Sequence, residues 1–375
     1  MKLLASGDHH FDAHSRFDEC VRVHEWMVEL ARDEQVDLFV SGGDIYERAS
    51  TPVEREAVAH WLQSMADVCP VVISKGNHDR QQDVHLMRRL RSTHPIIVEE
   101  RAAVHLVAGA AVAAVAWPEK KHMLALSGSS EQADADVRGA LQAVIRGLGV
   151  DLREHNGPRI ALGHFMVDGS VVSTGQPLLG MPLNIGLTDL ALFNAELGIM
   201  GHIHKAQRFD VGGAPFYYPG SPIRTDFGQL ESKVVLLAEF DGPRLMEVRE
   251  IETPARRMVH VNAEWSGELL CCGWSDLDVD AAEVRLRYNV PIDQRDAARR
   301  EVLELRDAMK EAGAHSVKLE EKVIAETRAR IPEVAAATRL PEKVEAFWKA
   351  KGFVPGERRE HLLSKLDELE KESAA

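Results

Sequence analysis

The sequence is poor in cysteine and has no long apolar run. Its four cysteines include one adjacent pair and no pair with a two-residue gap: Cys20, Cys69, Cys271 and Cys272. This usage argues against a disulfide framework or a zinc–thiolate site and is typical of the reducing cytoplasm. No stretch approaches the roughly 20 apolar residues that span a bilayer. The N-terminal run from Leu3 to Ala5 is too short for a signal peptide, so we expect a cytoplasmic protein without a membrane partner.

An excess of basic residues is also absent. Lysine and arginine number 45 against 59 aspartates and glutamates, which gives a formal charge of −14. That balance argues against a protein that coats nucleic acid, because such proteins usually present a basic surface. It does not exclude a nuclease, because carboxylates that bind metal ions count as negative although the bound cations reverse their local charge.

The sequence does contain enough apolar material for a large core. Of its 375 residues 45% are hydrophobic and 28% charged, which is ordinary for two or three globular domains. The first 250 residues alternate short apolar strands with amphipathic helices, as in an α/β fold. The predicted strands are Lys2–Ser6, Leu38–Ser41, Val71–Ser74, Arg159–Leu162 and Leu197–Met200. The predicted helices are Arg16–Arg32, Thr51–Asp67 with a capping box at its start, and Glu131–Leu148.

The last third of the chain has a different pattern. Val234–Phe240 and Leu245–Ile251 alternate around Asp241-Gly242, which predicts an antiparallel hairpin, and Thr253-Pro254 marks a boundary. The elements predicted beyond it are a strand, a helix, a strand and two terminal helices: Glu283–Val290, Asp296–Ala312, Ser316–Leu319, Glu342–Lys351 and Glu357–Glu370. The predicted domains are therefore residues 1–252, 253–333 and 334–375. We find no internal repeat and no low-complexity tract.

Five short polar segments each follow a predicted strand. They are Gly7-Asp8-His9-His10, Gly43-Asp44, Gly76-Asn77-His78-Asp79, Gly163-His164 and Gly201-His202-Ile203-His204. Ligands gather at the carboxyl ends of strands in open α/β sheets, so we expect five strand ends to converge on one rim of the sheet. In an extended segment residues two apart point the same way, so Asp8 and His10 can reach one ion together, as can His202 and His204. The preceding glycines let the backbone turn sharply off each strand.

The residue types in these segments indicate a metal site. Asp, Asn and His without Cys suit divalent ions such as Mn²⁺, Fe²⁺ or Zn²⁺. Seven such residues are too many for one tetrahedral ion but fit two ions that share a carboxylate: Asp8, His10, Asp44, Asn77, His164, His202 and His204. Two neighbouring ions can clamp an in-line phosphoryl displacement. A single Gly-His or Gly-Asp is usually structural, but coincidence explains five such segments in this order poorly.

These segments resemble the motifs of the calcineurin-like metallophosphoesterase superfamily over roughly residues 1–225. A narrower resemblance, to the SbcD family of DNA-repair nucleases, lies in Gly201–Gln207 and Tyr218–Gly228. It implies an α/β fold with a four-layer β-sandwich flanked by helices, a small α+β capping domain, and a C-terminal helical segment that docks on an SbcC-like coiled-coil ABC-type ATPase. It also implies DNA as substrate and a homodimer, with helices Thr51–Asp67 and Asp83–Ser92 as candidate dimer surface.

The same resemblance assigns roles to single residues. One ion would be held by Asp8, His10, Asp44 and His204, and the other by Asp44, Asn77, His164 and His202, with Mn²⁺ as the expected metal. His78 would be the catalytic histidine, oriented by Asp79, that stabilises developing charge or protonates the leaving oxygen. Glu47 departs from the family pattern, because some members have His or Asp three residues after the bridging aspartate. This departure leaves the balance of exonuclease and endonuclease action open.

Other side chains have two interpretations. We expect His9 to lie behind the ligands or at the surface. The following groups either contact DNA or form ordinary surface and loops: Arg80, Arg224, the cluster Arg88, Arg89 and Arg91, and the segment Trp117–Lys121. An apolar stripe near the C-terminus either packs internally or receives a partner helix: Leu362, Leu363, Leu366 and Leu369.

Three functions are compatible with these patterns. The first is a DNA exonuclease and endonuclease that works with an ATPase. The second is a stand-alone phosphomonoesterase or cyclic-nucleotide phosphodiesterase, against which the Gly220–Arg224 run and the long C-terminal extension argue. The third is a non-catalytic scaffold, against which the complete ligand set argues.

Overall fold

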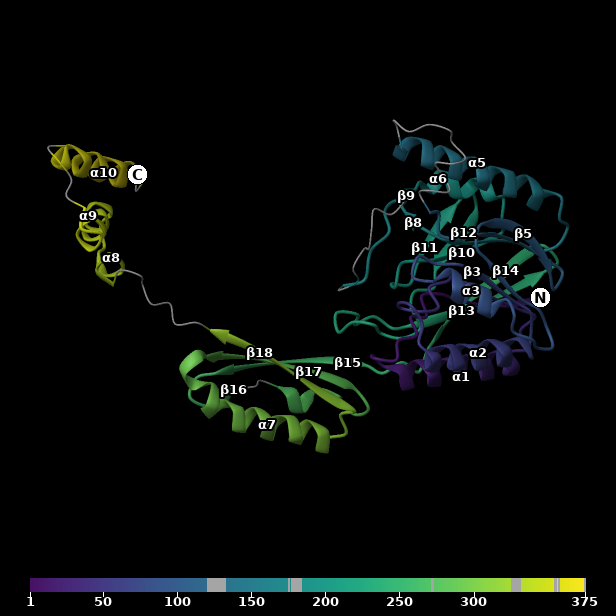
Figure 1. Ribbon diagram of the computed structural model, residues 1–375, viewed down its shortest axis with the longest axis horizontal. Coiled ribbons are helices and arrows are strands. Elements are labelled where there is room, and N and C mark those ends of the chain that lie inside the picture. The colour runs from purple at the N-terminus through teal and green to yellow at the C-terminus, as the bar shows by residue number, and fades with distance from the viewer. Residues whose placement is uncertain are drawn as a thin grey trace. The chain divides into compact units, whose positions relative to one another are not determined.

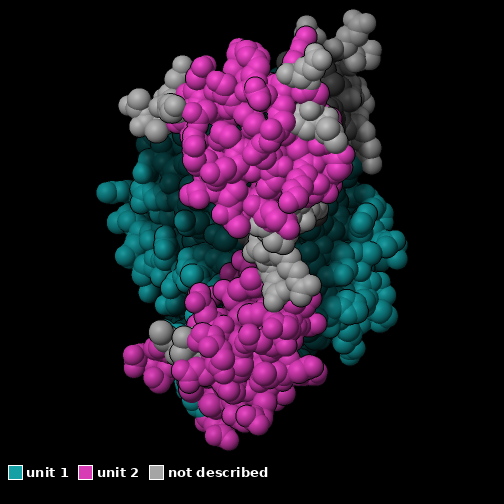
Figure 2. Space-filling view, turned by 90° about the vertical axis from the view of Figure 1, so that its left-hand side faces the viewer, with its two compact units in different colours: residues 1–260, 277–285, 312–317 teal, residues 261–276, 286–311, 318–375 magenta. Residues whose placement is uncertain are grey.

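A computed structural model describes residues 1–119, 133–174, 176, 184–270, 273–324, 332–353, 356 and 358–373 (Figure 1). The chain forms two compact units, which Figure 2 colours separately. The first comprises residues 1–260, 277–285 and 312–317, and the second comprises residues 261–276, 286–311 and 318–375. The predicted domain boundaries after residues 252 and 333 stay a prediction. Among the described residues no helix is both long and apolar enough to cross a membrane.

The first unit contains two six-stranded sheets. The first sheet has the strand order β14-β13-β1-β2-β3-β4. Its parallel strands are β1 (Lys2–Ser6), β2 (Leu38–Ser41), β3 (Val71–Ser74) and β4 (Ile96–Glu99). β13 (Val234–Asp241) pairs antiparallel with β1 and forms the predicted hairpin with β14 (Arg244–Glu252). Gly242 in the hairpin turn has a φ of 54°, a conformation that glycine adopts at little cost.

The second sheet has the strand order β11-β12-β10-β7-β6-β5. Its strands are β5 (Ala102–Val107), β6 (Ala110–Val115), β7 (Arg159–His164), β10 (Leu197–Gly201), β11 (Gln207–Val211) and β12 (Ala214–Tyr218). The expectation that five strand ends share the rim of one sheet is therefore wrong. β1, β2 and β3 belong to the first sheet, whereas β7 and β10 belong to the second. A separate two-stranded sheet pairs β8 (Met166–Val167) with β9 (Asn184–Ile185).

Side-chain alternation along β1 explains how the two sheets pack. Leu3 and Ala5 join a buried cluster that also contains Val112 and Ile160 of the second sheet. Leu4 points the other way, into a cluster shared with helices. Each sheet thus buries one face against the other sheet and one face under helices, which gives the four layers that the resemblance implied.

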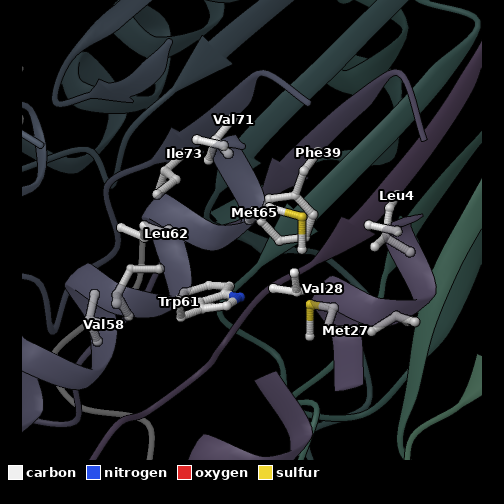
Figure 3. Close-up of a cluster of buried hydrophobic side chains, with 14 of the residues drawn as sticks. Leu4, Met27, Val28, Phe39, Val58, Trp61, Leu62, Met65, Val71 and Ile73 are labelled. Atoms are coloured by element: carbon white, nitrogen blue, oxygen red, sulfur yellow. The ribbon is translucent and has the colours of Figure 1, made fainter. Parts of the chain in front are cut away.

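Helices cover the outer face of the first sheet. They are α1 (Phe17–Asp33), α2 (Pro52–Ala66) and α3 (Gln81–Met87). Figure 3 shows Met27, Trp61 and Met65 of these helices gathered with Phe39 and Ile73 of the sheet. Truncation of a buried aromatic such as Trp61 to alanine typically costs about 3–5 kcal/mol.

The predicted capping box at the start of α2 is present. Thr51 accepts a hydrogen bond from the Glu54 backbone, and the Glu54 carboxylate accepts one from the Thr51 backbone. The predicted helix Asp83–Ser92 corresponds to α3, which begins earlier and ends at Met87.

The outer face of the second sheet is covered by α5 (Ala133–Arg153), α6 (Leu187–Leu190) and the short η1 (Ala191–Phe193). Figure 1 shows α5 on the side of the first unit opposite to α1 and α2. The predicted start of α5 at Glu131 lies outside the described residues.

A four-stranded sheet with the order β16-β15-β17-β18 follows in the chain. Its elements are β15 (Met258–Trp265), β16 (Leu269–Leu270), η2 (Trp274–Asp276), β17 (Glu283–Pro291), η3 (Ile292–Gln294), α7 (Arg295–Glu311) and β18 (Ser316–Ile324). Leu286, Tyr288 and Val290 alternate as buried residues on β17, and α7 buries Ala298 and Val302. The predicted strand, helix and strand are confirmed as β17, α7 and β18, and their separation as a small α+β domain stays a prediction.

The C-terminal segment is helical, as predicted. It consists of α8 (Pro332–Ala336), α9 (Leu340–Ala350) and α10 (Arg359–Ser373). Arg339 pairs with Asp367, and Arg359 pairs with Glu345, so ion pairs tie α10 to the α9 region. Leu362 and Leu369 are exposed on α10, and Glu357, the predicted helix start, lies outside the described residues.

Candidate metal centre

The strand ends of the two sheets meet backbone to backbone. A Cβ atom on Gly42 would lie 2.7 Å from the Gly201 nitrogen, and one on Gly201 would lie 2.3 Å from the Gly42 carbonyl oxygen. Only glycine permits this approach of β2 and β10, because any side chain would push the two sheets apart. The contact brings the polar segments of both sheets into one cleft.

The segments that carry Asp8, His10 and Asp44 have left-handed backbone. Their φ angles are 51°, 48° and 49°, so the extended conformation that we expected for Asp8 to His10 is wrong. This conformation costs a residue other than glycine roughly 1–3 kcal/mol and is typical of functional sites. Hydrogen bonds between the two loops hold it: Asp8 N to Gly43 O at 2.9 Å, and His10 N to Asp44 O at 3.0 Å.

One group of side chains surrounds the Asn77 amide. We call Asp44, Asn77, His164 and His202 the Asn77 cluster. The Asn77 Oδ1 atom lies 3.0 Å from His164 Nε2 and 3.1 Å from His202 Nδ1. His164 Nε2 is also 3.2 Å from the Asp44 carboxylate. Its Nδ1 donates to the Gly42 carbonyl at 2.6 Å, which directs Nε2 toward the other members of the cluster.

A second group adjoins the first, and we call Asp8, His10 and His204 the His10 cluster. One donor atom from each of these three residues lies within 4.8 Å of the others. Asp8 also comes within this distance of Asp44 and His164, so the two clusters are contiguous. The structure thus brings all seven predicted ligands together, and their role as ligands remains a proposal.

The two clusters fit a cation on chemical grounds. Asp8 Oδ2, both ring nitrogens of His10 and His202 Nε2 are buried, and none has a hydrogen-bond partner among the residues that the structure describes. Buried polar atoms in folded proteins are almost always paired. Four such atoms, on a carboxylate and two imidazoles, are of the kind that divalent metal ions bind.

The pKa values of the ionisable groups in the centre are set by burial and by the neighbouring charged side chains. Burial raises the pKa of Asp8 to about 6 and lowers the pKa of His202 to about 3. Burial alone would also lower the pKa of His164, but the facing Asp44 carboxylate raises it to about 9. Burial opposes ionisation of Asp44 as well, yet His164 keeps the pKa of that carboxyl far below its usual range. A proton on His164 therefore balances the charge of Asp44 at neutral pH.

His78 lines the same cleft and is held by backbone. Its Nδ1 donates to the Glu47 carbonyl at 2.5 Å, and its backbone N–H donates to Asp44 Oδ1 at 2.8 Å. A carbonyl oxygen only accepts, so Nδ1 carries the proton and Nε2 is the ring nitrogen available to a substrate.

Asp79 does not orient His78, which corrects our expectation. Its two oxygens accept from the backbone N–H groups of Ile45, Tyr46 and Gly76, at 2.8, 3.3 and 2.9 Å. Asp79 therefore fixes the loop that carries Asp44 to the loop that carries Asn77. The family resemblance implied this pairing of side chains, but adjacent residues point in different directions.

Some residues around the centre were not predicted from the sequence. The Gln176 amide donates to His202 O at 2.6 Å and accepts from His204 N at 3.1 Å, which clamps that segment. Lys233 is buried and donates to His204 O at 3.0 Å. Trp117 packs on His202, with ring centroids 4.9 Å apart. No sequence motif marks these contacts, because they join loops that are distant in the chain.

Three residues with open interpretations are now placed. His9 is fully buried, with Nδ1 2.8 Å from His24 Nε2 and Nε2 2.9 Å from Ser41 Oγ, so it is not a surface residue. Arg224 is also buried, and its guanidinium donates to three backbone carbonyls, which rules out the predicted phosphate contact in this conformation. Arg88 donates to Val98 O and to Glu100.

DNA contact by Arg80, Arg89, Arg91 and Trp117 stays a prediction. Lys120 and Lys121 lie outside the described residues.

The family comparison decides the wider assignment. Residues 1–206 match the family model described as calcineurin-like phosphoesterase, which is more than half of the chain. The chain belongs to the calcineurin-like phosphoesterase family. It is thereby a phosphoester hydrolase by family, and divalent metal ions are the family's cofactors.

Named relatives at low identity agree with this membership. The chain is 23% identical to the SbcD component of the SbcCD nuclease of Bacillus subtilis over 257 residues, which cover 61% of this chain and 63% of that protein. It is 25% identical to the SbcD component of the same nuclease of Escherichia coli K12 over 292 residues, 70% of each chain. A solved dimetal phosphatase from Danio rerio is 14% identical with a TM-score of 0.40, over 67% of this chain and 98% of that one. That likeness is too low to bear on the reaction.

Proposed function

We propose that the chain is a metal-dependent DNA nuclease that hydrolyses phosphodiester bonds with two divalent ions, Mn²⁺ being the expected metal. Asp8, His10, Asp44 and His204 hold one ion, and Asp44, Asn77, His164 and His202 hold the other. The orphaned donor atoms in both clusters support this assignment. When bound, such a pair of ions lowers the pKa of water and stabilises negative charge on a phosphoryl group.

The observation that carries the choice of a nuclease is the position of the SbcD-like run. Ser221 donates its backbone N–H to His204 O at 3.2 Å, and Thr225 Oγ1 lies 3.3 Å from His204 Nδ1. Ile223, Thr225 and Asp226 line the cleft. The segment that resembles the SbcD nucleases is thus part of the cleft wall itself, where a substrate would lie.

His78 completes the proposed reaction. Its ring reaches the cleft with Nδ1–H fixed on the Glu47 carbonyl, so Nε2 faces the substrate. In the ring protonated at both nitrogens, Nε2–H donates to the leaving oxygen or stabilises charge on the phosphate. Asp79 supports this by holding the loops on either side.

The cleft volume also bears on the substrate. Its accessible space is about 170 Å³, below the range of roughly 300–1,000 Å³ for pockets that enclose small-molecule ligands. The cleft fits a reacting phosphodiester group while the remainder of a polymer stays outside.

Partners are part of the same proposal. The exposed Leu362 and Leu369 of α10 suit docking of a coiled-coil ABC-type ATPase of the SbcC kind. Val53 on α2 and Leu86 on α3 are exposed apolar residues on the helices that we propose for a homodimer.

The test compares substrates under one metal condition. Purified protein with Mn²⁺ is assayed on plasmid DNA, on bis-p-nitrophenyl phosphate and on p-nitrophenyl phosphate. We expect cleavage of DNA and of the diester; activity confined to the monoester would overturn the nuclease proposal. Co-purification with a candidate coiled-coil ATPase, followed by the DNA assay with and without ATP, tests the partner.

A further inference from the structure

Glu47 contacts two histidines of the centre with two different groups. Its carboxylate lies 2.7 Å from His10 Nδ1, and its backbone carbonyl lies 2.5 Å from His78 Nδ1. The two imidazole rings stand edge to face with their centroids 5.1 Å apart. One residue of the loop after β2 therefore touches both a proposed ligand and the proposed catalytic histidine.

The loop that carries Glu47 is itself fixed. Glu47 N donates to Phe11 O at 3.2 Å, and Phe11 N donates to Ile45 O at 2.9 Å. The neighbouring Arg48 pairs with Asp12 at 2.7 Å and acts on the Glu47 carboxylate through its charge alone. The two backbone hydrogen bonds fix the backbone of Glu47, from which its carboxylate reaches His10.

We propose that Glu47 is a positioning residue that orients His10 for the metal ion of the His10 cluster, an inference that rests on the proposed two-metal function. A carboxylate that accepts Nδ1–H fixes the ring and leaves Nε2 as the ligand atom. In this protein neither ring nitrogen of His10 makes a hydrogen bond within the described part of the chain. Nδ1 faces the Glu47 carboxylate at ion-pair distance, which leaves Nε2 as the atom for the ion. The His10 side chain is 2% exposed and that of Glu47 is 38% exposed. Glu47 therefore lies at the rim of the cleft and contacts a ring that is buried inside it.

A third cation site at His10, Glu47 and His78 is the main competing interpretation. Donor atoms of these residues do lie within 4.8 Å of one another. However, His78 Nδ1 already donates to the Glu47 carbonyl, and His10 Nδ1 faces the carboxylate. The first is a hydrogen bond and the second an ion-pair contact, both within the protein, which favours the positioning role.

The backbone and the side chain of Glu47 can be separated by mutation. Substitution removes the carboxylate from His10 but keeps the carbonyl on His78. Loss of a carboxylate behind a histidine ligand typically weakens metal binding about 10–100-fold. We expect Glu47→Ala to weaken one of two Mn²⁺ sites by this factor and to leave the other unchanged. Glu47→Gln keeps an acceptor oxygen without the charge and should give an intermediate loss.

The experiment titrates Mn²⁺ into metal-free full-length protein by calorimetry and by electron paramagnetic resonance. Activity on bis-p-nitrophenyl phosphate is then measured as a function of Mn²⁺ concentration, and we expect kcat of both variants to recover at saturating metal. Glu56→Ala is the matched control, because Glu56 is an exposed residue of α2 outside the cleft lining. Thermal unfolding of the metal-free proteins checks that all variants fold.

Two results would overturn the inference. Equal weakening of both sites would mean that Glu47 only maintains the loop. Unchanged Mn²⁺ affinity with a kcat that metal does not restore would mean that Glu47 acts on the substrate. If one site weakens but no variant or wild type cleaves DNA, Glu47 keeps this role and only the nuclease proposal fails.

Discussion

The two halves of the centre are held in different ways. In the Asn77 cluster, the polar groups bond to one another or to backbone: His164 to Gly42 O, Asn77 to both histidines, and Asp44 to the His78 backbone. In the His10 cluster, the rings depend on side chains from outside the five polar segments that carry the ligands. Glu47 holds His10, and Thr225 holds His204 through a 3.3 Å contact.

This difference indicates which site is pre-formed. A site whose donors are already fixed loses little conformational freedom when the ion binds. We therefore expect the Asn77 cluster to bind its ion more tightly and the His10 cluster to be tuned by its supporting side chains. The following experiments either remove this difference in affinity between the two clusters or measure it.

Asp44→Asn should weaken ion binding at both clusters and so remove the difference in affinity between them, because Asp44 serves both clusters in the proposed scheme. Each ion contributes several kcal/mol to catalysis, so loss of both costs activity on the order of 10⁴-fold or more. Calorimetry should detect weak binding or none at either site. Asp241→Asn, an exposed change in the β13–β14 turn, is the control and should bind two ions. Retention of one tight site would contradict the bridging role.

His78→Gln should leave both metal sites intact and still abolish most activity. Proton transfer or charge stabilisation by such a group is worth about a hundred- to ten-thousand-fold in kcat. Added Mn²⁺ should not restore the rate, in contrast to the Glu47 variants. His85→Gln, on the exposed side of α3, is the matched control. An activity loss that excess Mn²⁺ reverses would show that His78 acts through the metal instead.

The residues that the structure gathers at the centre could be predicted from the sequence because they lie in short local motifs. Asp8 with His10, Asn77 with His78, and His202 with His204 are each recognisable within a few residues. What could not be predicted depends on contacts between distant segments. Glu47 meets His10 across 37 positions, and Lys233 meets His204 across 29. Asp79 was misassigned for the same reason, because its partners are on the loop after β2.

The fold could be predicted in part for similar reasons. β1, β2 and β3 are apolar and bounded by turn residues, and their predicted bounds are confirmed. β6 was missed because it consists of alanines and valines, and alanine has little preference for strands. The division into two sheets does not follow from strand pattern, because both have buried strands. It depends on pairing between strands that are far apart, such as β1 with β13.

Release of a proton on Mn²⁺ binding should distinguish the Asn77 cluster from the His10 cluster. The pKa of His164 is raised to about 9 by Asp44, so this ring is protonated in the metal-free protein at neutral pH and must lose its proton to bind an ion. Below that pKa, each proton displaced changes metal affinity by about tenfold per pH unit. We expect Mn²⁺ affinity at the tighter site to rise with pH between about 7 and 9 and then to level off. Calorimetry in buffers of different ionisation enthalpy should count one proton. An affinity independent of pH in this range would show that His164 is neutral before the ion binds.

Thr225→Val should give the smallest effect and tests how finely the His10 cluster is tuned. The change keeps the shape of the side chain and removes only the hydroxyl near His204 Nδ1. Gln229 lies 3.5 Å from the same nitrogen and can take over part of the contact. A hydrogen bond of this kind contributes about 0.5–1.5 kcal/mol, so Mn²⁺ affinity at the weaker site should fall a few-fold, less than in Glu47→Ala. Because His204 keeps its backbone bonds to Gln176 and Lys233, the tighter site should not change. A larger loss at the tighter site would mean that the two clusters are not supported independently.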